Sequence, residues 1–273
     1  MLRTEPYTLN MGPQHPSTHG VLQVQLELDG ERIVKATPIM GYLHRGIEKL
    51  LEARTYAQGL PYTDRLDYIS AMNNNFGYAR AVEELAGIET TPRAEYIRVI
   101  MAELNRINSH LIFIGTLAND LGASTGMLYC FRDRERILDI FNLVCGARQT
   151  FHYIRIGGVK EDLSPEAAEM IRAFVDSVPD FLAEYNRLLT GNEIFARRIR
   201  GTSPMTTEEA LACSMTGPNL RATGLAFDLR KVDGYSVYED FDFDITVGAH
   251  GDNWDRYMVK LAEIAESAKI VRP

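Results

Sequence analysis

The apolar residues of this chain change their spacing once, near residue 45, and this change limits the folds that the chain can adopt. Before that point the stretch VLQVQLELDG (21–30) alternates strictly, which is typical of a strand with one apolar face. Asp29-Gly30 predicts a hairpin turn, ERIVKATP the returning strand, and PYTLN an earlier strand. From Ile47 onward the apolar residues recur at intervals of three and four, as in helices. We therefore expect an α+β fold in which an N-terminal antiparallel β-sheet packs on an antiparallel helical bundle.

Long helices joined by short connectors favour a bundle rather than a second sheet. Thr91-Pro92 and Ser164-Pro165 mark two of the expected starts, because proline is well tolerated in the first helical turn. The predicted helices span 47–58, 61–87, 93–118, 131–153 and 166–189.

The pattern loosens after Gly191. We expect a short helix at 206–214 with Thr207 as its cap, a β-like segment at 234–246, and a final helix at 254–271. This organisation divides the chain into three parts. They are a β domain at 1–60, a helical bundle at 61–190, and a mixed α/β extension at 191–273.

Composition excludes several classes of function. The net charge of −8 argues against nucleic acid as a partner, because phosphate binding needs a basic surface. No run reaches the roughly 18 apolar residues of a membrane span, so a membrane role must come through partner subunits. The three cysteines, Cys130, Cys145 and Cys213, are too far apart for a disulfide framework, a zinc ribbon or an iron–sulfur cluster held by this chain alone. No dinucleotide or phosphate-loop motif is present.

The loop GPQHPSTHG (12–20) is the densest candidate for chemistry. Pro16 prevents a regular helix through it, so the spacing of His15 and His19 does not place both rings on one helical face. No carboxylate accompanies them, which makes a zinc site a weak interpretation. Two interpretations stay open: the histidines pin the turns of a hairpin loop, or a rigid loop presents an imidazole into a cleft as a hydrogen-bond donor or proton source.

Tyr68 lies at the margin of an apolar helical stripe in the segment YTDRLDY. A tyrosine in such a place packs amphipathically, and its phenol can equally donate to a ligand carbonyl. The neighbouring charges of Asp64, Arg65 and Asp67 are expected to be solvated.

Two polar residues stand out in the predicted helix at 93–118 and just beyond it. His110 lies next to the inward face, where a buried histidine with a satisfied hydrogen bond is the usual explanation. Asp120 follows at the C-terminal end, where the helix dipole disfavours an acidic side chain unless a partner balances it.

Seven segments together resemble one family. They are GPQHPSTHG, LHRGIEK, PYTDRLDY, RAEYIRVIMAELNRINSHL, NDLGA, YIRIGGVKEDL and LRATGLAFDLRK. They resemble the quinone-site D subunits of NADH:quinone oxidoreductase, respiratory complex I, which are related to the large subunits of nickel–iron hydrogenases. The resemblance covers essentially the whole chain and implies a hydrogenase large-subunit-like fold. Because the family chain continues well past residue 273, it also implies a C-terminally incomplete version.

The resemblance implies roles for particular residues. The D subunit forms a quinone cavity with the B subunit, which carries the terminal [4Fe–4S] cluster, and this chain itself is expected to bind no metal. The loop at 12–20 reaches into the cavity, where His19 and Tyr68 hydrogen-bond the quinone head-group and His15 belongs to the same binding loop. The resemblance makes Asp120 the partner of His19 and places Arg65 near the cluster.

Function and surroundings follow from the same resemblance. The chain is expected to be a peripheral-arm subunit of complex I, coupled to proton translocation, with the B and C subunits and the membrane-embedded H subunit as partners. It is expected on the cytoplasmic side of the cell membrane, and its substrate is ubiquinone or menaquinone. Quinone reduction needs two protons with two electrons, which an imidazole and a phenol on opposite carbonyls can deliver.

Two alternatives to this function are disfavoured. A membrane-bound energy-converting hydrogenase with a nickel–iron site needs two C-x-x-C pairs, and this sequence has none. A non-catalytic assembly subunit is disfavoured by the joint presence of His19, Tyr68 and Asp120.

The sequence departs from the family pattern at two positions. Ile39 and Thr150 stand where many members have histidine. His152 is the histidine nearest to the second position. In a helix, two residues turn a side chain by roughly 200°, which would place His152 on the opposite face from Thr150.

Overall fold

The computed structural model describes residues 6–13 and 21–272. The chain divides into two compact units, Met1–Arg54 and Thr55–Pro273, and each is described by itself.

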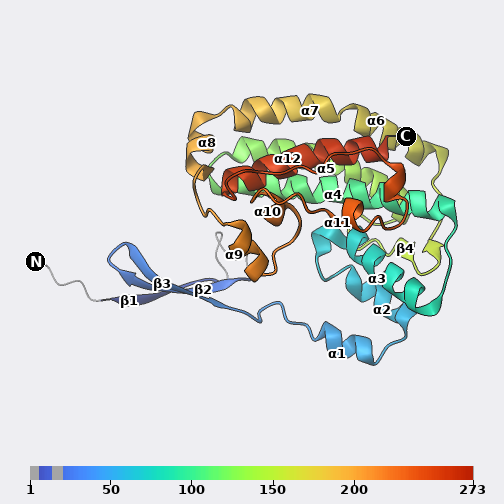
Figure 1. Cartoon of the computed structure of the whole chain (residues 1–273), viewed down its shortest axis with the longest axis horizontal. Helices are drawn as coiled ribbons and strands as arrows, with labels where there is room; N and C mark the ends of the chain where they lie inside the picture. The colour runs from blue at the N-terminus through green and yellow to red at the C-terminus, as the bar shows by residue number, and fades with distance from the viewer. Residues whose placement is uncertain (1–5, 14–20, 273) are drawn as a thin grey trace, which may run out of the picture. The chain divides into compact units, whose positions relative to one another are not determined.

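The first unit holds the predicted sheet. Strands β1 (Tyr7–Met11), β2 (Gln23–Asp29) and β3 (Arg32–Ile39) form an antiparallel sheet in the order β1-β2-β3 (Figure 1). The turn between β2 and β3 contains Gly30 at φ 62°, a left-handed conformation that glycine adopts without strain. Leu26 and Leu28 are buried, which confirms the predicted apolar face of β2. Helix α1 (Ile47–Glu52) follows.

The second unit is mostly helical. Its longer helices are α2 (Tyr56–Thr63), α3 (Ala71–Ala86), α4 (Pro92–Asp120), α5 (Ser124–Cys145), α6 (Pro165–Asp176), α7 (Val178–Tyr185) and α12 (Asn253–Val271). The shorter ones are α8 (Glu193–Ile199), α9 (Thr207–Ala212), α10 (Gly217–Arg221) and α11 (Leu229–Val232). Strands β4 (Ile154–Arg155) and β5 (Gly158–Val159) form a small hairpin. A π-helical turn at Asn186–Thr190 follows α7, and 3₁₀ turns lie at Tyr68–Ser70 and Tyr238–Asp240.

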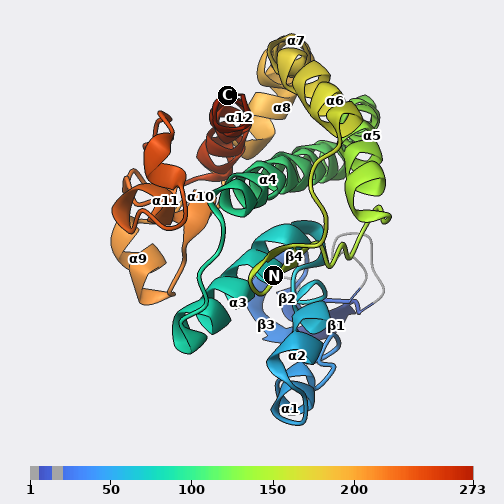
Figure 2. The same ribbon diagram turned by 90° about the vertical axis from the view of Figure 1, so that its right-hand side faces the viewer.

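Helix α4 is the centre of this unit. It packs against α5 and α12, while α6 contacts α5 and α7 contacts α12 (Figure 1). In the turned view, α10 and α11 lie on one side of α4 and α5 lies on the other (Figure 2). The hydroxyl of Thr91 caps α4 at Ala94, and that of Ser164 caps α6 at Ala167. Both predicted helix starts are therefore confirmed.

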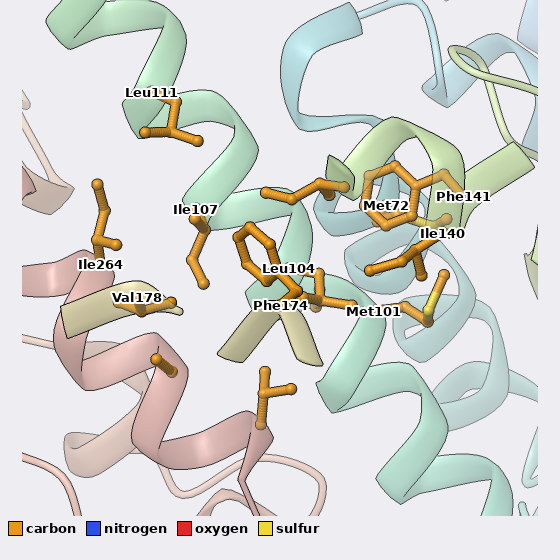
Figure 3. Close-up of a cluster of buried hydrophobic side chains, with 14 of the residues drawn as sticks. Met72, Met101, Leu104, Ile107, Leu111, Ile140, Phe141, Phe174, Val178 and Ile264 are labelled. Atoms are coloured by element: carbon orange, nitrogen blue, oxygen red, sulfur yellow. The ribbon is translucent and has the colours of Figure 1, made fainter. Parts of the chain in front are cut away.

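The core lies where these helices meet. Side chains from α3, α4, α5, α6, α7 and α12 converge in it (Figure 3): Met72, Met101, Leu104, Ile107, Leu111, Ile140, Phe141, Phe174, Val178 and Ile264. All of them are buried, so the middle of α4 is surrounded by apolar contacts. This packing makes α4 a rigid support for polar groups at its surface.

Several predicted helix limits are wrong, each for a local reason. The expected helix 47–58 is two helices, because Thr55 forms a capping box with Gln58 and starts α2 anew. Pro61 therefore lies inside α2 and does not start the next helix. The expected helix 131–153 runs from Ser124 to Cys145, because Gly146 adopts φ 75° and ends it.

Three further expectations differ from the structure. The expected helix 166–189 is interrupted at Ser177, whose hydroxyl donates to the carbonyl of Phe174. The cap of α9 is Thr206 and not Thr207. The segment 234–246 is not β-structure: its aromatic residues, among them Tyr238 and Phe243, are buried against the helices instead of lining a strand. The β4–β5 hairpin was not expected.

Candidate functional site

Tyr68 lies on a short turn between α2 and α3. The carboxylate of Asp67 accepts a hydrogen bond from the backbone N–H of Ile69 at 3.3 Å and caps the 3₁₀ turn. Tyr68 itself is 52% exposed, and its hydroxyl makes no hydrogen bond with any residue that the structure describes. The phenol is therefore available to an external acceptor.

Asn105 on α4 fixes this turn in place. Its side chain is fully buried, donates to the carbonyl of Ile69 at 3.1 Å, and accepts from the N–H of Met72 at 2.9 Å. Both bonds join segments more than thirty residues apart in sequence. The turn that carries Tyr68 is therefore held by the rigid centre of the bundle.

Arg65 accompanies Tyr68 on the same segment. Its side chain is half-exposed, donates to the carbonyl of Pro61, and lies 4.0 Å from Oδ2 of Asp64. The guanidinium thus places a positive charge at the surface, three residues before Tyr68 in the sequence.

Asp64 is fully buried, contrary to the expectation that this charge cluster is solvated. Its Oδ1 accepts a long hydrogen bond, 3.4 Å, from the backbone N–H of His152. Burial raises the pKa of Asp64 above its ordinary value, because desolvation of the charged form outweighs the attraction of Arg65 and the hydrogen bonds. Its Oδ2 is buried and has no hydrogen-bond partner among the described residues.

The loop after α5 contacts Asp64 through the backbone N–H of His152. Thr150 and His152 adopt left-handed conformations, with φ 58° and 46°, so the helical-face argument for these residues does not apply. Desolvation lowers the pKa of His152, and the nearby charges of Arg155 and Arg65 act in the same direction. The ring is therefore neutral near pH 7. Its Nδ1 has no hydrogen-bond partner in the described part of the chain.

Asp120 lies apart from the residues around Tyr68. It is the exposed last residue of α4 and lies fifteen residues beyond Asn105, which is about 22 Å along a helix axis. A direct contact between Asp120 and Tyr68 is therefore excluded by the length of α4. The predicted residues His15 and His19 lie outside the described residues.

His110, the other polar residue singled out on α4, has a structural role. His110 is buried and its Nε2 lies 2.7 Å from the carboxylate of Glu263, which confirms the expected satisfied histidine. Sequence reasoning missed Asn105, and it named Asp64 but wrongly expected its side chain to be solvated. A signal existed for Asp64, because it follows the buried residues Leu60 and Thr63 at helical spacing.

Metal and membrane sites can be assessed within the described ranges. There, no three His, Cys, Asp or Glu side chains are grouped so as to hold a metal ion. Burial raises the pKa of the Cys130 and Cys145 thiols to about 12, so neither is a thiolate at neutral pH. Among the helices of residues 6–13 and 21–272, none has both the length and the apolar character of a membrane span.

Comparison with known proteins identifies the family. Residues 120–273 match the model of the respiratory-chain NADH dehydrogenase 49-kDa subunit. The chain is 54% identical over 271 residues to the NADH-quinone oxidoreductase D subunit of Desulforamulus reducens, covering 99% of this chain and 74% of that protein. The D subunits of Carboxydothermus hydrogenoformans and Clostridium beijerinckii are each 52% identical over 99% of this chain, which covers 74% and 73% of those proteins. The chain therefore belongs to the family of 49-kDa, or D, subunits of the respiratory NADH–quinone oxidoreductase, complex I.

Proposed function

We propose that this chain forms the quinone-binding and quinone-reducing site of complex I together with the iron–sulfur subunit beside it. The observation that carries the proposal is the phenol of Tyr68. It is half-exposed, has no partner among the described residues, and stands on a turn that Asn105 ties to the core. A donor held in this way needs little reorganisation to bind a quinone carbonyl.

Arg65 contributes the electrostatics of the site. Its guanidinium is half-exposed and lies 4.0 Å from the buried carboxyl of Asp64, whose pKa is raised by burial. A positive charge near a bound quinone stabilises the negative charge that electrons bring to it. The cluster of the neighbouring subunit supplies those electrons when the complex is assembled.

His19, His15 and Asp120 complete the proposed site. The conversion of quinone to hydroquinone takes two electrons and two protons. The phenol of Tyr68 hydrogen-bonds one carbonyl oxygen, and the imidazole of His19 hydrogen-bonds the other. Asp120 holds that imidazole protonated, because a nearby carboxylate favours the charged ring.

The surroundings follow from this assignment. The chain works in the peripheral arm, held at the cytoplasmic side of the cell membrane by its partners. These are the B subunit with the terminal cluster, the C subunit, and the membrane-embedded H subunit, through which quinone reduction is coupled to proton translocation.

Replacing the two quinone donors tests the proposal. Tyr68→Phe and His19→Ala, each assembled into the complex, should lower quinone reductase activity about tenfold to a hundredfold, the effect of losing one hydrogen bond to a reacting carbonyl. Reduction of an artificial acceptor upstream of the clusters should persist. Tyr56→Phe is the matched control, because Tyr56 is 58% exposed and its hydroxyl lies on another helix. Normal quinone turnover in both site variants would refute the assignment.

A further inference from the structure

A cavity lies in the helical unit, and Ser70, the last residue of the turn that carries Tyr68, is in its lining. It encloses about 570 Å³, which is within the usual range of small-molecule sites. Side chains from α3, α4, α10 and α12 line it, and three of them are cations: Arg80, Arg106 and Lys260. The acid in its lining is Asp233. The cavity is therefore positively charged, although the whole chain carries a net charge of −8.

Arg106 in the cavity lining also belongs to a largely buried network of ion pairs. Glu103 pairs with Arg106 at 3.1 Å and with Arg230 at 3.0 Å, and Glu263 pairs with Arg221. Asp228 is the third acid and lies 2.7 Å from Arg230. Within this network three carboxylates balance three guanidinium groups: Glu103, Asp228, Glu263, Arg106, Arg221 and Arg230.

Lys260 is a further cation that has no carboxylate partner in this network. Among the described residues its ammonium group has no ion pair and no hydrogen bond; it lies 3.4 Å from the centre of the Phe113 ring. Burial lowers its pKa to about 8, and Arg256 acts in the same direction against the opposing effect of Glu263. A partly buried ammonium without an ion-paired carboxylate is unfavourable, and an anion in the cavity would offset that cost.

The remaining lining fits a ligand with a charged end and an apolar body. Asn73, Ser109 and Asn219 supply hydrogen-bonding groups near the cations. Phe76 and Tyr235 form an edge-to-face pair, with ring centres 5.8 Å apart, on the wall. His110 adds no charge at neutral pH, because burial lowers its pKa.

We propose that this cavity binds a small phosphate-bearing organic molecule, whose phosphate is held by Lys260 together with Arg80 and Arg106. Three cations from three different helices suit a group that carries more than one negative charge. The aromatic wall contacts the rest of the ligand. The cavity adjoins the proposed quinone site at Ser70, but its three cations take no part in that assignment.

The proposal fixes the direction of a pH effect. A bound anion raises the pKa of Lys260, so anion binding takes up a proton above pH 8. The contribution of Lys260 to affinity should therefore be constant below about pH 8 and fall as the pH rises further. The other charged or titratable groups of the cavity and its surroundings are Arg80, Arg106, His110, Arg221, Asp233, Arg256 and Glu263.

Equilibrium dialysis of labelled pyrophosphate against the assembled complex tests the site. Lys260→Gln should weaken binding at one site per complex at least tenfold, and Lys260→Arg should restore most of it. Lys269→Gln is the matched control, because Lys269 lies on the same helix but is half-exposed and paired with Glu266. Retained quinone reductase activity in each variant verifies assembly.

Three outcomes would overturn the proposal. The wild-type complex takes up no pyrophosphate; Lys260→Gln binds it as the wild type does, which means an adventitious ion only; or citrate displaces it with equal or higher affinity, which means that the site does not select phosphate.

Discussion

At the scale of single residues, Asp64 has the most unusual environment in the candidate site. The fold buries its carboxyl completely and leaves one oxygen without a partner among the described residues. Arg65, at 4.0 Å and half-exposed, is too far and too well solvated to compensate. The pKa of Asp64 is therefore raised in the native state, which favours its protonated form more than the unfolded chain does.

The substitution Asp64→Asn tests this protonation state through stability. The pKa of Asp64 is raised from 3.8 in the folded chain, so the folded state loses stability as the pH rises from that value through the folded pKa. Asparagine retains the acceptor for His152 and cannot ionise. The free energy of unfolding of the variant, relative to the wild type, should therefore increase with pH over this interval.

Urea unfolding of both proteins at a series of pH values measures the effect. Asp67→Asn is the control, because Asp67 is exposed and asparagine can still cap its turn. A relative stability of Asp64→Asn that falls as the pH rises would show that the native state prefers the carboxylate.

At the scale of elements, the site depends on the junction between the Tyr68 turn and α4. A 3₁₀ turn of three residues has little stability of its own, so its position comes from tertiary bonds. Asn105 provides two of them at once. The position of the Tyr68 phenol thus depends on α4 as much as on the turn.

Asn105→Ala should disturb stability and quinone binding together. It leaves the N–H of Met72 without its acceptor, and an unsatisfied buried group costs about 1–3 kcal/mol. The looser turn should raise the KM for quinone. The activity with an artificial acceptor should change less. Asn142→Ala, at an exposed position of α5, is the control. An unchanged KM in a destabilised Asn105→Ala complex would mean that the turn does not position the donor.

At the scale of the whole molecule, the proposal pairs His19 with Asp120, two residues that are far apart in the sequence. If they form a pair, the losses of quinone reductase activity in His19→Ala and Asp120→Asn should be non-additive in a double-mutant cycle, because paired residues share their loss. Additive effects would mean that Asp120 acts independently of the loop at 12–20.

The parts of the fold that were predictable rest on local signals. The strict alternation of β2 and the Thr91-Pro92 start of α4 were read from neighbouring residues, because strands and caps depend on them. Tyr238 could not be placed in this way. Its aromatic segment resembles a strand, but its hydroxyl donates to Glu103, which lies 135 residues earlier in the chain. Such long-range burial leaves no periodic signature.

For the candidate site, the structure gives the positions of the predicted residues that it describes and leaves their roles as predictions. Tyr68 and Arg65 were singled out from residue type and family resemblance, and both lie on one exposed segment. The burial of Asp64 depends on the loop at His152, which is 88 residues away. The expected helix 131–153 included that loop, because the end of α5 at Gly146 was not predicted.

Photoaffinity labelling by a quinone analogue tests the central claim most directly. The assembled complex is irradiated with a photoreactive quinone, and the labelled peptides are mapped by mass spectrometry. We predict labels on the segments 64–70 and 12–20, removed by excess unlabelled quinone and weakened by Tyr68→Phe but not by Tyr56→Phe. Competable labelling confined to other parts of this chain, or to other subunits, would contradict the claim.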